Sequence, residues 1–423
     1  MTGWEAIAAT ATRSFAVAVL CGWLAPHVAP LAKSNRVWTA LAAAPFLTPG
    51  LMVGYVWRQV TIGHVGLASE AAYLAVLAAV TLPVATLAAM FAPPTADARA
   101  IALWRLARPT GRQSLRMAVA RHRDQIAAGL VAALWAMQES EIGILMQAAG
   151  WPEWTQRQLQ GARAAADLLG TLWPAVAIQV ALLGVAFVTL RGRTGAVSTR
   201  RATIAARVAI VAAALVATAY PLGSILVEAS RGVRGLSQQR GLVRTLAWSL
   251  TLAVAASAIA WPLVRGRLAS LAAVGLLGSL LIAVGTQAAV AAVEPRLLGT
   301  PLPHLAALAA SLLAKAAALR WAVAATRRPR AIRAAELAGA SRAIFAIRER
   351  PRLFAFAVLV WSAYFDVMTA SVLAAPGLET TPLQLYNFVH FGQIVTLAAW
   401  LLLAAAVPIA AGLLAASVLR RMC

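Results

Sequence analysis

Apolar runs of about bilayer length recur along the entire chain, and they limit the folds that it can adopt. Of the 423 residues, 61% are hydrophobic and 12% are charged, and the mean hydropathy is +0.77. A soluble core of this size does not need so much apolar sequence, whereas each transmembrane helix takes about 20 apolar residues. The sequence therefore predicts an all-α polytopic membrane protein with about 11 transmembrane helices. The expected spans are residues 14–32, 38–58, 66–92, 125–148, 168–190, 204–228, 243–264, 267–293, 302–325, 353–375 and 393–418.

Basic residues fall mainly in the short loops between these runs. The chain carries 37 Lys and Arg against 14 Asp and Glu, a formal net charge of +23. In a soluble protein this excess would suggest nucleic acid, but in a membrane protein arginines in short loops mark the cytoplasmic side. The pattern predicts a protein of the inner (plasma) membrane that contacts lipid and no nucleic acid, with its N-terminus outside and its C-terminus cytoplasmic. One arginine-rich loop, at 231–244, falls on the predicted outside and opposes this topology.

The sequence also repeats in one direction. Trp135–Ser140 (WAMQES) is similar to Trp361–Asp366 (WSAYFD), and each segment follows an arginine-rich loop at an offset of 226 residues. A second pair, Arg13-Ser14-Phe15 and Trp248-Ser249-Leu250, repeats at an offset of 235. Copies that run the same way predict two parallel halves, unlike the inverted repeats of many secondary transporters. The expected halves are residues 1–200, with about five transmembrane helices, and residues 201–423, with about six.

A basic segment at residues 327–352 precedes the tenth expected span and contains a stretch of small residues. This stretch gives a short helix a small face that can dock in a groove, and its members are Ala334, Ala335, Ala338, Gly339 and Ala340. Gly339 permits a tight turn or a close backbone approach. Pro351 is expected to break the helix before the next span begins. The alternative is an ordinary cytoplasmic loop rich in Ala and Arg.

This segment resembles the cytoplasmic loop that binding-protein-dependent ABC importer permeases insert into their ATPase subunits. The family pattern is Glu-Ala-Ala, three residues, Gly, then about a dozen residues to a Pro, and the matching residues here are Ala334, Ala335, Gly339 and Pro351. Arg333 stands where the family has its acidic residue, and Glu336 follows three places later. The resemblance implies an ATPase-coupling loop that includes Arg333, Ala334, Ala335, Glu336, Gly339, Ala340, Ser341 and Pro351.

Other segments, in the same order along the chain, are similar to the fused two-half permeases for ferric iron, thiamine and related solutes. They are Ala44–Gly50 with Tyr55–Trp57, Thr194–Leu222 and Leu378–Tyr386. The resemblance implies two kinds of partner, ABC ATPase subunits in the cytoplasm and an extracytoplasmic solute-binding protein. In the first half, a weaker counterpart of the coupling region contains Arg105, Arg108 and Gly111, but no Ala-Ala pair precedes this glycine at the family spacing.

Three acidic residues, Glu139, Glu141 and Asp366, lie inside expected spans, where an unpaired charge is costly. We expect them to line a translocation path and to meet a cationic solute. Pairing with Arg, or capping of a broken helix, is the alternative. Residues two apart on a helix differ by about 200°, so only one of Glu139 and Glu141 can face the path. We expect Glu141, because Gly143 follows it in an arrangement that resembles the family's Gly-Glu-Phe-Gly segment.

The sequence lacks the motifs of several other functions. It contains no Gly-x-x-x-x-Gly-Lys-Ser/Thr phosphate loop, so an importer needs a separate ATPase. It contains no His/Glu metal motif, serine nucleophile elbow or redox cysteine pair, which predicts no enzyme activity, no cofactor and no metal. The first 13 residues lack signal-peptide features, so the first apolar run is expected to remain as a helix. A secondary transporter with an intramembrane acidic site, an intramembrane enzyme and a non-transporting scaffold are the alternative functions.

Overall fold

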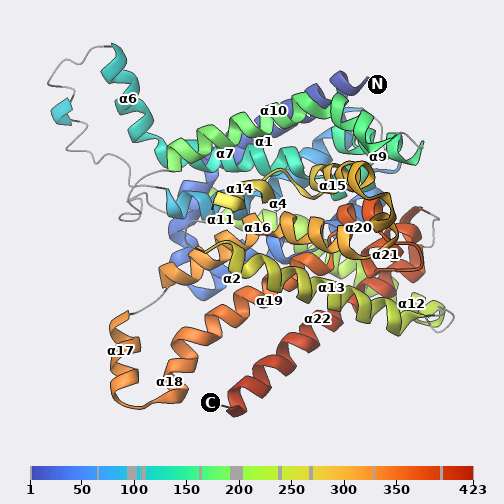
Figure 1. Cartoon of the computed structure of the whole chain (residues 1–423). Helices are drawn as coiled ribbons and strands as arrows, with labels where there is room; N and C mark the ends of the chain where they lie inside the picture. Colours follow the sequence, from blue (N-terminus) through green and yellow to red (C-terminus); the bar gives the residue numbers. More distant parts are fainter. Residues whose placement is uncertain are drawn as a thin grey trace. The chain divides into compact units, whose positions relative to one another are not determined.

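Two compact helical units make up the chain in the computed structural model (Figure 1). The structure describes residues 2–63, 66–92, 102–104, 106, 111–161, 164–190, 203–236, 241–265, 270–326, 329–390 and 394–422. Unit 1 comprises residues 1–157 and 171–222, and unit 2 comprises residues 158–170 and 223–423. The described residues form helices and loops and contain no strand. The predicted boundary between the halves, at residues 200 and 201, lies outside the described residues.

Seven of the described helices are long and apolar enough to cross a membrane, and the number rises to nine if each of two bent helix pairs counts as one span. The chain is therefore an all-helical, multi-pass membrane protein, as its apolar runs predict. The count of eleven spans stays a prediction. Four of the expected spans, 38–58, 125–148, 267–293 and 353–375, are each divided between two described helices.

Unit 1 begins with a helix that starts earlier than the sequence analysis expected. α1 (Gly3–Ser34) opens with a capping box, in which the side chains of Thr2 and Glu5 each accept a hydrogen bond from the other residue's backbone N–H. This cap starts the helix in polar residues, ahead of the apolar run. The other helices that lie wholly or partly in unit 1 are α2 (Arg36–Leu47), α3 (Gly50–Thr61), α4 (Leu67–Phe91), α6 (Gly111–Arg121), α7 (Arg123–Gln138), α8 (Glu141–Leu145), α9 (Trp151–Gln160), α10 (Ala165–Leu190), α11 (Ile204–Ala214), the π-helical turn η1 (Leu215–Ala219) and α12 (Tyr220–Leu236).

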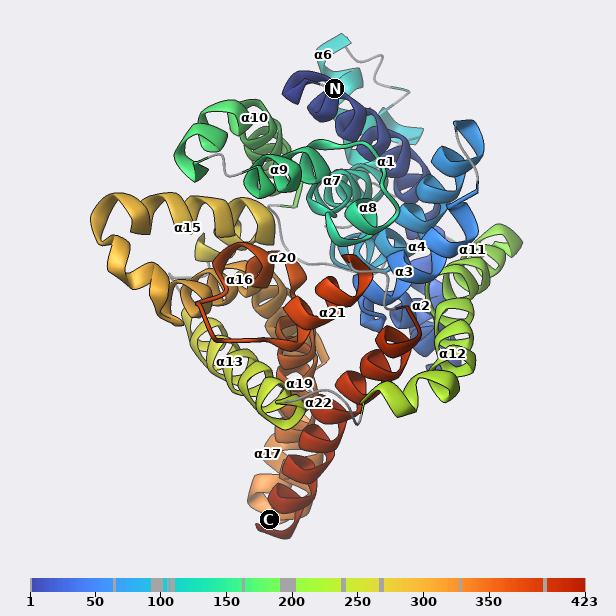
Figure 2. The ribbon, with the colours of Figure 1, turned by 90° about the vertical axis from the view of Figure 1, so that its right-hand side faces the viewer.

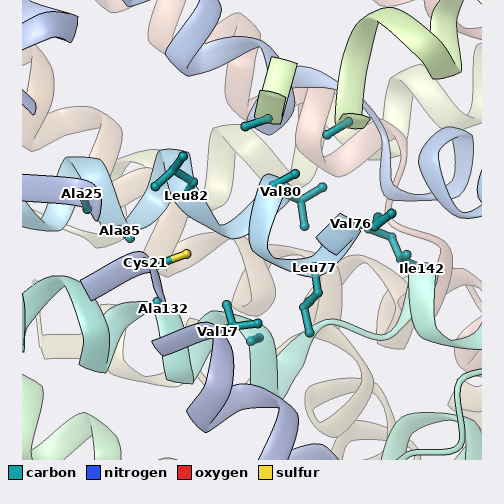
Figure 3. Packing of buried hydrophobic residues seen from close by; sticks show 14 of the residues in the cluster. Val17, Cys21, Ala25, Val76, Leu77, Val80, Leu82, Ala85, Ala132 and Ile142 are labelled. Carbon is teal, nitrogen blue, oxygen red and sulfur yellow. The ribbon is translucent and has the colours of Figure 1, made fainter. Parts of the chain in front are cut away.

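The core of unit 1 forms where α1, α4 and α7 pack together. Small residues allow these backbones to lie close together. At Gly22 of α1, for example, an added Cβ would lie only 3.0 Å from the carbonyl oxygen of Gln125 on α7. Figure 3 shows apolar side chains of the three helices meeting in one cluster, with Cys21, Leu77 and Ala132 among them. This packing holds in place the helix ends that carry the candidate site of unit 1.

Unit 2 has a core of its own, built by α13, α16 and α19. The shorter helices α15 and α20 pack against α16 and against each other. Figures 1 and 2 show α17 and α20 at opposite ends of α19. The helices of unit 2 are α13 (Leu242–Leu263), α14 (Ala272–Gly275), α15 (Ser279–Val293), the 3-10 turn η3 (Pro295–Gly299), α16 (Leu302–Thr326), α17 (Pro329–Leu337), α18 (Ser341–Ile344), the π-helical turn η4 (Phe345–Glu349), α19 (Arg350–Tyr364), α20 (Val367–Leu373), α21 (Thr381–His390) and α22 (Ile394–Met422).

Each unit contains helices that break partway along an apolar run. In unit 1, α2 and α3 meet at a bend of 80° at residues 48–49, and α7 ends at Gln138 before α8 begins at Glu141. In unit 2, residues 276–278 separate α14 from α15, and α19 and α20 meet at a bend of 46° at residues 365–366. The expected spans run through these breaks, because hydropathy is continuous across each of them. A break inside a span frees backbone groups, which other protein groups or a lined cavity must satisfy.

Candidate functional site

Glu139 lies in the break between α7 and α8 and caps the second of these helices. Its carboxylate accepts hydrogen bonds from the N–H groups of Ile142, at 2.7 Å, and Gly143, at 3.1 Å. The carboxylate also bonds the N–H of Glu141 and the hydroxyl of Tyr73 on α4, and this hydroxyl would lie 3.1 Å from a Cβ on Gly143. The carboxylate therefore satisfies N–H groups that the start of α8 leaves without a helical partner. Glu139 therefore follows the alternative that the sequence left open, the capping of a broken helix, because α7 ends at Gln138 and α8 begins at Glu141.

Glu141 is the first residue of α8, and its carboxylate lies against the start of α3. A Cβ on Gly50, the first residue of α3, would lie 2.7 Å from Glu141 Oε2. A second glycine one turn later, Gly54, would place a Cβ 3.0 Å from the Cα of Ile142. The two glycines thus let α3 approach the backbone of α8. A carboxylate at the start of a helix is favourable, because the helix dipole is positive there.

An ion pair joins α1 to α4 beside this break. The guanidinium of Arg13 bonds both carboxylate oxygens of Glu70, at 2.5 and 2.7 Å, and also the Ala149 carbonyl oxygen, at 2.6 Å. It lies 5.3 Å from the centre of the Tyr73 ring, within the range of a cation–π contact. A polar chain therefore runs from Glu70, through Arg13 and Tyr73, to Glu139. The sequence analysis missed Arg13 and Glu70, although both are charged residues within or beside an expected span.

A π-helical turn in unit 1 packs against the break between α2 and α3. In η1, the carbonyl oxygen of Val216 accepts a hydrogen bond from Trp57 Nε1 at 2.9 Å. The hydroxyl of Thr218 lies 2.9 Å from that of Thr48, which ends α2. A π turn leaves the regular hydrogen-bond register of a helix and is frequent at functional sites. Three irregular backbone segments of unit 1 are therefore held by side chains from neighbouring helices.

Asp366, the repeat-related acid, lies in the break between α19 and α20 of unit 2. Its side chain is buried, with 6% exposed, and caps α20 by accepting a hydrogen bond from the Thr369 N–H at 2.9 Å. Its other oxygen lies 3.4 Å from the hydroxyl oxygen of Ser311 on α16. Of the three predicted acids, Glu139 and Glu141 belong to unit 1 and Asp366 belongs to unit 2.

A hydroxyl group holds the start of a short helix in each unit. In unit 1, Thr10 of α1 accepts a hydrogen bond from the N–H of Trp151, the first residue of α9, at 3.1 Å. In unit 2, Ser249 of α13 accepts one from the N–H of Thr381, the first residue of α21, at 2.6 Å. Both hydroxyl groups are buried on the first long helix of their unit. In both contacts a side-chain hydroxyl on a long helix accepts a hydrogen bond from the first backbone N–H of a short helix. The two short helices, α9 and α21, also hold corresponding positions in the order of elements of their units.

The expected coupling loop forms a hook, α17 followed by α18, at one end of unit 2. Gly339 lies between these helices with a φ of +61°, a conformation that favours glycine, and a Cβ there would meet no atom within 4 Å. Arg333, Ala334, Glu336 and Gly339 are exposed, and Ala340 is partly buried. Glu336 pairs with Arg348 of η4 at 3.3 Å. The side chains of Ala335 and Ser341 lie outside what the structure describes.

Pro351 does not break the helix, and that expectation was wrong. The chain is helical from Ser341 to Tyr364, and Pro351 lies in the first turn of α19. The π turn η4 directly precedes α19, and the N–H of Arg350 donates a hydrogen bond to the Phe345 carbonyl oxygen. This wider turn changes the hydrogen-bond register next to the residue that has no N–H, so the helix continues.

In the first half, Arg105 and Arg108 lie outside the described residues. Gly111 begins α6, and a Cβ there would meet no atom within 4 Å. Within the part of the chain that the structure describes, no group of three or more His, Cys, Asp or Glu side chains is placed to hold a metal ion. Comparisons with protein-family models, with curated proteins and with solved structures found no match to this chain.

Proposed function

We propose that this chain is the membrane-spanning permease subunit of an ABC importer, with both halves fused in one polypeptide. It moves a small solute, such as ferric iron or thiamine, across the inner (plasma) membrane. Separate ATPase subunits in the cytoplasm supply the energy, and an extracytoplasmic solute-binding protein delivers the solute. The N-terminus lies outside and the C-terminus in the cytoplasm.

The observation that carries this proposal is the order of elements in the two units. Apart from α6, η3, the segment from α17 to η4, and the helices from α11 to α12 that precede α13, each unit has the same order: a long helix, a broken pair, a long helix, a second broken pair, a short helix and a last long helix. Unit 1 has α1, α2–α3, α4, α7–α8, α9 and α10, and unit 2 has α13, α14–α15, α16, α19–α20, α21 and α22. The hydroxyl contacts of Thr10 and Ser249 fall at the same step of this order. Two parallel halves of about five and six spans account for this agreement.

The exposed hook supports the coupling role of the Arg333–Ser341 segment. An importer must transmit the closure of its ATPase subunits to the helices that gate the path. The hook continues directly into α19, whose far end is the Asp366 break. Because the helix is continuous across Pro351, movement of the hook displaces α19 along its length. Glu336, which follows Arg333 by three residues, pairs with Arg348 and so links the hook to η4.

Replacement of Gly339 by aspartate tests the coupling role. Gly339→Asp adds a charged side chain on the exposed turn, so the variant should enter the membrane at the wild-type level but lose ATP hydrolysis that is coupled to transport. Gly377→Asp is the matched control, because Gly377 also has a positive φ, +76°, and open space around it. Each change strains the backbone by about 1–2 kcal/mol. Full coupled ATPase activity of Gly339→Asp would exclude the hook as the coupling element.

An ion-coupled secondary transporter is the second candidate function. The observation that favours it is the position of acidic residues at helix breaks in both units, because discontinuous helices bind substrate and coupling ions in such transporters. The two candidates differ in their energy source. Uptake of ferric iron, thiamine and a polyamine should be compared after ATP depletion and after collapse of ion gradients. Uptake that survives ATP depletion but stops when the gradients collapse would favour the second candidate.

A further inference from the structure

Arginine and aromatic side chains gather in unit 2 where the last turns of α13 and α16 meet the first turns of α19. The three helices pack against one another. The Arg320 guanidinium of α16 donates a hydrogen bond to the Trp261 carbonyl oxygen of α13 at 3.0 Å and lies 5.2 Å from the centre of the Trp261 ring. This ring meets the Phe356 ring of α19 edge to face, with the centroids 6.3 Å apart. Helix bundles present such side chains where they leave the hydrocarbon for the polar headgroups.

α13 and α19 run antiparallel, so the end of one lies beside the start of the other. Toward one end of the pair, Ser249 of α13 accepts a hydrogen bond from the Thr381 N–H, and the Thr381 hydroxyl bonds the hydroxyl of Tyr364, the last residue of α19. Toward the other end, Trp261 meets Phe356. The residues that follow Trp261 and the residues that precede Phe356 therefore leave the bundle at the same end.

Two arginines occupy this end, Arg265 just after α13 and Arg350 at the start of α19. Both are exposed, and neither forms an ion pair or a side-chain hydrogen bond with another residue that the structure describes. The acid beside Arg350 in sequence, Glu349, is already paired with Arg348 and Arg352. Two guanidinium groups thus lack a counter-charge within the described part of the chain.

We propose that this end of unit 2 binds an anionic phospholipid, with its phosphate at Arg265 and Arg350 and its acyl chains along α19. Phe354 lies one turn after Arg350 on the same face of α19, toward the apolar interior, and its side chain is 66% exposed. Arginine binds phosphate through paired N–H donors, and basic sites between transmembrane helices favour anionic headgroups.

A phospholipid fits both parts of this surface, because it combines a negative headgroup for the arginines with apolar chains for Phe354. A soluble phosphate would match the arginines alone. The proposal does not depend on whether ATPase subunits drive the chain, since it rests on one end of one unit.

Lipid binding can be measured on the purified full chain in an uncharged detergent. The melting temperature should rise, in a saturable way, when phosphatidylglycerol is added, and much less with phosphatidylcholine that has the same acyl chains. Arg265→Gln and Arg350→Gln remove side chains that have no partner among the described residues, so both variants should melt near the wild-type temperature without lipid. Each should raise the phosphatidylglycerol concentration that gives half-maximal stabilisation about fivefold, and the double variant about 25-fold.

Arg244→Gln is the matched control. Arg244 is also an exposed arginine of α13, but it lies in the first turn, at the opposite end of the helix. This variant should respond to phosphatidylglycerol at the wild-type concentration. Four outcomes would overturn the proposal. They are equal stabilisation by phosphatidylcholine, equal stabilisation by inorganic phosphate, a double variant that responds at the wild-type concentration, and a response that Arg244→Gln weakens as much as Arg350→Gln does.

Discussion

At the scale of single residues, Arg13 and Glu139 are two charged groups of an apolar bundle that are held by specific partners. Arg13 has a 13% exposed side chain and binds Glu70, whose side chain is 36% exposed. Glu139 binds two N–H groups and the Tyr73 hydroxyl. An unpaired charge at membrane depth would be disfavoured, so each of these contacts has a structural role.

Loss of the Arg13 side chain should destabilise unit 1. Arg13→Met leaves Glu70 and the Ala149 carbonyl oxygen without their donor, and we expect a loss of about 1–3 kcal/mol, reduced by the partial exposure of Glu70. Arg352→Met is the control, because the Arg352 side chain is 35% exposed and its partner Glu349 keeps its pair with Arg348, so the change should cost about 0.5 kcal/mol. Thermal unfolding in detergent, followed by tryptophan fluorescence, measures both. Equal melting temperatures for the two variants would contradict the structural role of Arg13.

The two glutamates of the α7–α8 break should respond differently to loss of charge. Glu139→Gln replaces one acceptor oxygen with an NH₂ group that opposes an N–H of α8, so stability should fall by about 1–3 kcal/mol. Glu141→Gln removes the charge that we expect to meet the solute, so it should lower uptake of a cationic solute. Denaturation curves and uptake assays on both variants separate the roles. A stable Glu139→Gln protein would show that Glu139 does not hold the start of α8.

At the scale of elements, the sequence predicts where helices lie better than where they break. Apolar runs marked the long helices correctly, because burial in lipid needs continuous hydropathy. The breaks follow instead from contacts with residues distant in sequence, such as Tyr73 with Glu139 and Ser311 with Asp366. Proline is an ambiguous signal, since Pro49 starts a helix at a bend whereas Pro83 lies inside α4. The sequence singled out Glu139, Glu141 and Asp366 but not the groups that Glu139 and Asp366 bind, and a role of the three acids in a translocation path stays a prediction.

The contact between α3 and α8 depends on glycine, and a single methyl group should disturb it. Gly54→Ala would bring a Cβ within 3.0 Å of the Ile142 Cα and of the Leu145 side chain. The backbone of α8 cannot move away from this Cβ without disturbing its packing, so the change should lower the free energy of unfolding by about 1–3 kcal/mol. Gly223→Ala in α12 is the control, since a Cβ there meets no atom within 4 Å and helix propensity favours alanine by about 1 kcal/mol. A Gly54→Ala protein that melts at or above the wild-type temperature would contradict the close approach of these helices.

At the scale of the whole molecule, the arginine distribution predicts that the hook is cytoplasmic and that the loop before α21 is external. In a background with Cys21→Ala and Cys423→Ser, an impermeant thiol reagent added to intact cells should label Glu379→Cys and leave Ser341→Cys unlabelled. Glu379 is exposed in the loop between α20 and α21. After the cells are broken, Ser341→Cys should also react. Labelling of Ser341→Cys in intact cells would reverse the topology.

The central claim is that this chain transmits the work of separate ATPase subunits. The most direct measurement is affinity purification of the tagged chain from native membranes, followed by mass spectrometry of the proteins that remain bound. We predict two copies of a nucleotide-binding ATPase subunit per chain, and loss of this ATPase when Gly339 is replaced by aspartate but not when Gly377 is. Purification of the wild-type chain with no ATPase, under conditions that keep it folded and able to take up solute, would contradict the claim.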